Sequence, residues 1–190
     1  MATIKLRRGF VAEANRWAID LRAELGLEAN APLCPWKLAK HLEIPIYLLS
    51  EMPVCKEREI LLEKQNGHDF SGVVCFDGIA AFIVINDAHE PKRQVSDIAH
   101  ELAHILLRHP RSSILRRDGV REFSSEHELE AERLGPTLLV SDAAALRACN
   151  LIENRHVTMS DLSDRWKISK EVIQMRINLS GAIRRISRAA

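Results

Sequence analysis

The sequence predicts an α+β fold in which a small antiparallel sheet packs on one long helix, with further helices at both ends of the chain. Three observations lead to this class. Two apolar runs, 73–76 and 81–85, flank Asp77 and Gly78, a dipeptide typical of a β-hairpin turn. A strongly helical pattern over 95–107 follows them. Stretches with apolar residues three or four positions apart come before and after this centre.

Length and composition limit the class of protein. The 190 residues suit one domain, or a domain with a small appendage, and 46% hydrophobic with 28% charged residues is typical of a soluble folded chain. The net charge of +1 excludes a protein whose whole surface is basic for binding polyanions. The longest apolar run, 79–85, is far shorter than the ~20 residues that span a bilayer. Without a signal-peptide pattern or a Cys-x-x-Cys pair, we expect a reduced, cytoplasmic protein.

The amino-terminal part predicts two helices and an edge strand. Apolar residues recur every three or four positions over 10–25, which is the pattern of an amphipathic helix. A short helix is expected over 35–42, where Pro35 suits the first turn. Residues 44–49 follow as a short extended segment. Pro45 places this segment at a sheet edge, because proline has no N–H to donate to a neighbouring strand.

The hairpin and the helix after it form the centre of the predicted fold. Every position of 81–85 is apolar, which predicts a strand covered on both faces. The helix over 95–107 has Ser96 or Asp97 as its expected N-cap, and Pro110 ends it.

A loop and a further helix are expected next. Residues 110–125 are polar, which favours a loop. The helix over 126–140 contains Gly135 and Pro136, and we expect this pair to bend or interrupt it, because proline removes a helical hydrogen bond.

The carboxyl-terminal part predicts two short helices, 159–166 and 170–179, which have the dimensions of a helix-turn-helix unit. We expect packing helices with a solvated basic edge rather than a surface that binds nucleic acid directly. The division of the chain is predicted as 1–145, with the sheet and the central helix, and 146–190, a small helical segment packed on it. The basic residues are Lys167, Lys170, Arg176, Arg184, Arg185 and Arg188.

One motif carries chemistry, the H-E-x-x-H sequence from His100 to His104. Two histidines four positions apart lie on the same face of a helix, so both imidazoles can reach one ion. Zinc accepts neutral imidazole nitrogen at about 2.0–2.1 Å. Glu101 is rotated about 100° around the helix from His100, where it can hold a metal-bound water without binding the metal. The motif predicts metal-assisted peptide hydrolysis.

A catalytic zinc site needs a third protein ligand, and the sequence offers several in one acidic helical stretch. The apolar stripe of that helix is formed by Ala131, Leu134 and Leu138. Glu128 and Glu130 lie on opposite sides of the stripe, so helix geometry alone does not choose the ligand. The candidates are Glu126, His127, Glu128, Glu130 and Glu132.

These two helices resemble those of the ImmA/IrrE family of metallopeptidases. The family pattern is H-E-L-x-H-x-L-L-H followed by E-x-E-A-N-x-F-A-x-x-L-L-M-P, and this chain has HELAHILLRH at 100–109 and ELEAERLGPTLLVS at 128–141. The resemblance extends over about 35–180, although its tail is less specific. Glu132 stands where the family has Asn, and it could hydrogen-bond a ligand histidine or compete for the metal. The other departures are Arg108, Leu134, Gly135, Val140 and Ser141.

The resemblance implies a zincin-like fold over 1–145 and a set of residue roles. His100 and His104 would be the Zn²⁺ ligands with Glu128, the first Glu of the second pattern, as the third. Glu130 is the fallback for that third position. Glu101 would be the general base. The departures from the family pattern remove none of these groups.

The resemblance also implies regulated proteolysis, in which a helix-turn-helix transcriptional repressor, often encoded on a mobile element or in a stress-response locus, is the substrate. The chain shows no amino-terminal repressor-type domain, so the substrate is expected to be a separate protein. The alternative is a non-catalytic module of the same fold that binds metal or grips a regulator. A Glu101→Gln variant separates the two functions, because it should keep zinc and lose cleavage only in a peptidase.

Overall fold

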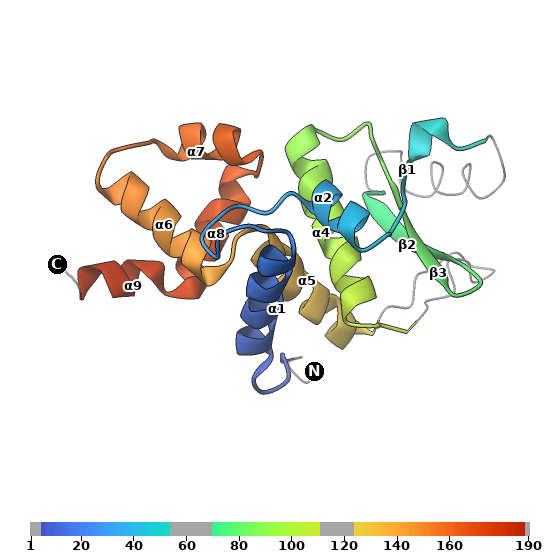
Figure 1. The fold of residues 1–190 in the computed structure, drawn as a ribbon, viewed down its shortest axis with the longest axis horizontal. Coiled ribbons are helices and arrows are strands. Elements are labelled where there is room, and N and C mark those ends of the chain that lie inside the picture. The colour runs from blue at the N-terminus through green and yellow to red at the C-terminus, as the bar shows by residue number, and fades with distance from the viewer. Residues whose placement is uncertain (1–4, 54–69, 111–123, 189–190) are drawn as a thin grey trace.

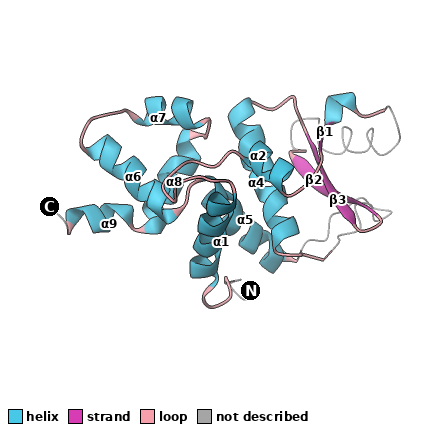
Figure 2. Cartoon of the chain, in the orientation of Figure 1, coloured by secondary structure: helices cyan, strands magenta, loops and turns pink. Residues whose placement is uncertain are grey.

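The computed structural model describes residues 5–53, 70–110 and 124–188, and it confirms the α+β class. These residues form eight α-helices and one three-stranded sheet, which lies at one end of the molecule beside α2 and α4 (Figures 1 and 2). No helix in these ranges is long and apolar enough to cross a membrane. The helices are α1 (Phe10–Glu24), α2 (Pro35–His41), α4 (Pro91–Leu106), α5 (Ser125–Leu139), α6 (Asp142–Glu153), α7 (Met159–Trp166), α8 (Lys170–Ser180) and α9 (Ala182–Ser187), and the strands are β1 (Ile46–Leu48), β2 (Gly72–Asp77) and β3 (Ala80–Ile85).

The sheet has the strand order β1–β3–β2, and it is mixed rather than antiparallel. β2 and β3 form the predicted antiparallel hairpin, with Gly78 in the turn at a φ of +57°. β1 is an outer strand, as Pro45 indicated, but it runs parallel to β3, with Tyr47 opposite Val84. The prediction of an antiparallel sheet was therefore wrong. Only strands joined by a tight turn must run in opposite directions, and β1 reaches the hairpin through a long connection.

β3 is the central strand, and both of its faces are covered as predicted. Ile83 and Ile85 belong to the core formed with α1, α2, α4 and α5, whereas Val84 belongs to a smaller cluster with Leu49 and Val73. This arrangement places α4 against the sheet, with α5 on its other side (Figure 1). The helical members of the main core include Phe10, Leu21, Leu38, Ile98, Leu102, Leu134 and Leu138.

The central helix α4 begins earlier than its apolar pattern indicated. Its first residue is Pro91 and its N-cap is Glu90, so the prediction of Ser96 or Asp97 as the N-cap was wrong. Proline suits a first helical turn, because the N–H that it lacks would have no partner within the helix. This first turn is partly exposed and carries no buried apolar side chain. The periodic pattern therefore starts only at Val95.

The helix α5 runs through Gly135 and Pro136 without interruption, which corrects the predicted break. Pro136 has no N–H to donate to the Glu132 carbonyl, so the helix lacks this one bond but continues to Leu139. Its carbonyl still accepts a hydrogen bond from the Val140 N–H at 3.0 Å. The predicted loop over 110–125 lies largely outside the described residues.

Helices α6 to α9 pack around a second core, which reaches α4 through Val95 and Ala99. α7 and α8 match the two predicted tail helices, whereas α6 and α9 were not predicted. α6 is rich in alanine, which has the strongest helix propensity, and its buried face consists of the small side chains Ala144, Ala145, Ala148 and Cys149. The division of the chain into 1–145 and 146–190 stays a prediction.

Two buried arginines join α1 and α8 to the end of α5. Arg22 of α1 donates to the Leu139 carbonyl at 2.9 Å, and burial, with a contribution from Arg176, lowers its pKa to about 10. Arg176 of α8 donates to the Val140 carbonyl at 2.8 Å and to Asp142 Oδ1 at 2.7 Å. Each guanidinium therefore satisfies a carbonyl at the end of α5, where helical carbonyls have no partner in the helix.

Replacing Arg176 with Met is expected to lower the free energy of unfolding by about 2–4 kcal/mol, since Val140 and Asp142 lose a buried partner. The side chain of Asp142 is 24% exposed, which keeps the expected loss below that of a fully buried pair. Urea denaturation measures the change. Arg184→Met on the exposed side of α9 is the control, with an expected change below about 0.5 kcal/mol. Equal losses in the two variants would contradict a specific role for the buried guanidinium.

Candidate metal centre

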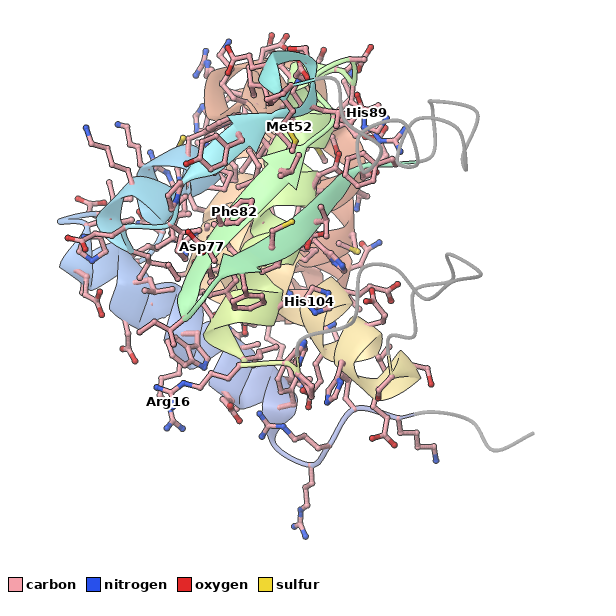
Figure 3. The ribbon with its side chains drawn as sticks, turned by 90° about the vertical axis from the view of Figure 1, so that its right-hand side faces the viewer. Arg16, Met52, Asp77, Phe82, His89 and His104 are labelled. Carbon is pink, nitrogen blue, oxygen red and sulfur yellow. The ribbon has the colours of Figure 1, made fainter. Side chains whose placement is uncertain are left out.

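The structure brings His100 and His104 of α4 together with Glu128 of α5. The two Nε2 atoms of the histidines lie 3.1 Å apart. Glu128 Oε2 lies 3.3 Å from His100 Nε2, and Glu128 Oε1 lies 3.4 Å from His104 Nε2. In Figure 3 the labelled His104 lies beside the sheet on the side where α5 runs. Helical spacing places the histidines one turn apart, and the packing of α5 on α4 adds the carboxylate.

This donor set fits a zinc ion. Donor atoms at about 2.0–2.1 Å from a tetrahedral zinc are about 3.3–3.4 Å from one another. The three measured separations, 3.1, 3.3 and 3.4 Å, agree with that value. Two imidazoles and a carboxylate are also a ligand set that catalytic zinc sites use. Within the described ranges, His100, His104 and Glu128 form a group of three residues suited to hold a metal ion.

Glu101 lies beside these three donors but is not one of them. Its side chain is buried, with 6% of its surface exposed. It points toward β2, because a Cβ atom added to Gly72 would lie 3.3 Å from the Cγ of Glu101. A buried carboxylate therefore lies between the histidine helix and the start of β2, next in sequence to His100.

The close approach of α5 to α4 depends on Gly135. A Cβ atom at this position would lie 3.1 Å from the Ala99 carbonyl oxygen and 3.1 Å from the Cα and N atoms of His100. These contacts are with backbone atoms, which cannot move aside as a flexible side chain can. Gly135 therefore lets α5 pack directly on the turn of α4 that carries His100, and this packing sets how close Glu128 comes to the histidines.

Gly135→Ala is expected to destabilise the protein by about 1–3 kcal/mol, since the added methyl group pushes the helices apart. Helix propensity alone predicts the opposite sign, a gain of up to about 1 kcal/mol. The same substitution should weaken zinc binding by moving Glu128. Thermal unfolding and a zinc titration measure the two effects, with Glu126→Ala on the exposed face of α5 as the control. A more stable variant would show that the helices have room to separate.

Negative charge surrounds the histidine helix. Burial by itself lowers the pKa of His100, but the carboxylates of Glu128, Glu101 and Glu132 together raise it above its ordinary value. One turn before His100, burial raises the pKa of Asp97, against the opposing effects of His89, Arg93 and His100. The carboxylates that raise this pKa would also attract a metal cation to the neutral imidazole.

Glu130, the fallback for the third ligand, lies outside the cluster. Its Oε2 is 3.2 Å from His109 Nε2, and its Oε1 accepts a hydrogen bond from Arg7 Nε at 2.8 Å. His109 in turn lies against His104, with 2.9 Å between their Nδ1 atoms. Helical spacing did not indicate this contact, because residues five apart do not share a helix face.

The remaining candidates for the third ligand do not join the cluster. Glu126 is exposed at the start of α5. His127 stacks on the ring of His109, with the ring centroids 4.5 Å apart. Glu132 acts on His100 through its charge.

Comparison with known proteins identifies a protein family that matches this chain. The model described as the IrrE N-terminal-like domain, of the peptidase M78 family, matches residues 55–178, which is more than half of the chain. None of the curated proteins matches the chain. The matched span contains both α4 and α5, and thus all three clustered donors. The chain therefore belongs to the ImmA/IrrE family of metallopeptidases.

Proposed function

We propose that this chain is a zinc-dependent endopeptidase that cleaves a transcriptional repressor. One observation carries the proposal: in a member of a metallopeptidase family, donor atoms of His100, His104 and Glu128 converge with separations of 3.1–3.4 Å. In this proposal these three residues hold the zinc ion, with Glu128 as the third ligand. The resemblance to the ImmA/IrrE pattern supports a helix-turn-helix repressor as the substrate class.

The mechanism assigns one proton carrier. When bound, zinc supplies Lewis-acid chemistry that polarises the peptide carbonyl and favours loss of a proton from water. The Glu101 carboxylate accepts a proton from the attacking water as the water oxygen bonds to the carbonyl carbon of the substrate. Glu101 then donates this proton to the leaving amine nitrogen as the carbon–nitrogen bond breaks, which gives a carboxylic acid and an amine.

The position of Glu101 supports this role. It is buried, it is adjacent in sequence to His100, and its Cγ lies close to the first residue of β2. A peptide bound at the start of β2 would therefore have a scissile carbonyl near both the carboxylate and the clustered donors. Burial also excludes bulk water, which strengthens electrostatic interactions at a site of this kind.

The test uses the full chain loaded with one equivalent of zinc and a peptide library derived from a bacterial proteome. Mass spectrometry of new amino termini reports cleavage, and a chelator-treated sample is the control. Peptidase activity predicts new termini that disappear with the chelator and return with added zinc. Purified helix-turn-helix repressors are then tested in the same way. Zinc binding without cleavage of any peptide or repressor would favour the non-catalytic module.

A further inference from the structure

The end of α4 turns back on its own last turn. Leu107 is the C-cap, and Arg108 has a left-handed φ of +52°. The Arg108 N–H donates to the Ile105 carbonyl at 3.0 Å, and the His109 N–H donates to the His104 carbonyl at 3.0 Å. These two bonds define a Schellman motif, in which the residue after the left-handed position lies against the residue at the start of the last turn. The motif therefore places His109 beside His104.

Because the two residues are close, their side chains take part in a series of polar contacts that runs from His104 to Arg7. His104 Nδ1 and His109 Nδ1 lie 2.9 Å apart, and His109 Nε2 lies 3.2 Å from Glu130 Oε2. Arg7 Nε donates to Glu130 Oε1 at 2.8 Å, and its two terminal nitrogens donate to Glu13 at 2.6 and 2.7 Å. The side chains of His104 and His109 are each 6% exposed, and that of Glu130 is 15% exposed, so these three members of the series are largely protected from water.

Which atoms donate and which accept in this series of contacts follows from Arg7, which can only donate. Arg7 is always a donor, so Glu130 accepts from it and is suited to accept from His109 Nε2–H as well. A neutral His109 with its proton on Nε2 has an acceptor at Nδ1. His104 must then donate from Nδ1–H. This tautomer leaves the lone pair at His104 Nε2, the atom that faces His100 and Glu128.

We propose that His109 is a positioning residue for the metal centre: it holds His104 in the tautomer and ring orientation that presents Nε2 to the metal. Glu130 fixes His109, and Arg7 fixes Glu130. This inference rests on the proposed metal site. Partners on the second nitrogen of a ligand histidine change metal affinity by about 10- to 100-fold when they are removed.

Three variants of His109 separate positioning from packing. Phe keeps a ring of similar size that can still stack on His127, but it has no nitrogen. Asn places an oxygen where Nδ1 lies, so it can accept from His104 but does not reach Glu130. Gln places its amide near the Nε2 position, so it can reach Glu130 but not serve His104. His41→Phe is the matched control, because His41 also pairs with a glutamate, Glu24, at 2.9 Å and is not in the metal cluster.

The first measurement is the zinc Kd of the full chain, by competition with a chromophoric chelator. We expect His109→Phe and His109→Gln to weaken binding by about 10- to 100-fold, His109→Asn to stay within about 3-fold of wild type, and His41→Phe to be unchanged. A loss of packing would affect Asn and Gln alike, since both lack the ring. Wild-type affinity in His109→Phe, or equal affinities in the Asn and Gln variants, would overturn the positioning role.

The second measurement is the tautomer of His104 in the metal-free chain, by long-range ¹H–¹⁵N NMR of the imidazole. The wild type should show the proton on Nδ1, and His109→Phe should shift the population toward Nε2–H. An Nε2–H tautomer in the wild type would overturn the proposal. The two proposals fail differently: a wild type without zinc affinity removes both, whereas zinc binding that depends on His109 without any peptide cleavage removes only the peptidase.

Discussion

Glu101→Gln is expected to reduce peptide cleavage by about 10²- to 10⁴-fold while the chain still binds one zinc ion. The amide has the size of the carboxylate but cannot accept the proton of water, and general base catalysis contributes a factor of this order. Because Glu101 is not among the three clustered donors, its replacement leaves the metal ligands intact. Initial rates on a peptide identified from the library, with metal analysis of the same samples, measure both quantities.

The control is Glu126→Gln, the same chemical change on the exposed face of α5. It should keep the wild-type rate. Full activity in Glu101→Gln would assign the proton transfer to another group. If the wild type binds zinc and has no activity to lose, the same comparison instead favours the non-catalytic module.

Glu128→Ala is expected to abolish stoichiometric zinc binding, because two histidines on one helix then remain as the only protein ligands of the proposed site. The loss should exceed the roughly 10- to 100-fold effect of removing an outer partner. Metal content per chain, measured after purification without chelator, tests this. Glu130→Ala is the comparison variant, since Glu130 contacts His109 and Arg7 instead of the cluster.

The comparison between these two carboxylates decides which one is the third ligand. We expect Glu130→Ala to retain about one zinc per chain at saturating metal, with a weaker Kd. Zinc retained in Glu128→Ala and lost in Glu130→Ala would reverse the assignment, and it would mean that metal binding rearranges the start of α5.

Sequence periodicity predicted most helices, and the reason is local. α1, α7 and α8 bury apolar residues at helical spacing, so their patterns show both the helix and its buried face. The same method missed α6, whose buried face consists of small side chains, and the partly exposed first turn of α4, which has no buried apolar side chain. It also could not give the direction of β1, because the pairing partner of a strand depends on the path of the chain between them.

For the site, the sequence by itself determined the pair His100 and His104 and the neighbouring Glu101. Helical geometry fixes their relative positions within one turn, whatever surrounds the helix. The sequence also indicated α5 as the source of a third metal donor, without choosing between Glu128 and Glu130.

Only the tertiary structure decided which carboxylate meets the histidines and what lies behind them. Hydrophobic periodicity shows which face of a helix is buried, but not the height or rotation at which it packs on its neighbour. In this protein the contact at Gly135 sets that packing and places Glu128 at the cluster. His109 reaches His104 because a left-handed residue reverses the chain at the end of α4. Both outcomes depend on backbone contacts between or beyond helices, which a residue pattern along one helix does not encode.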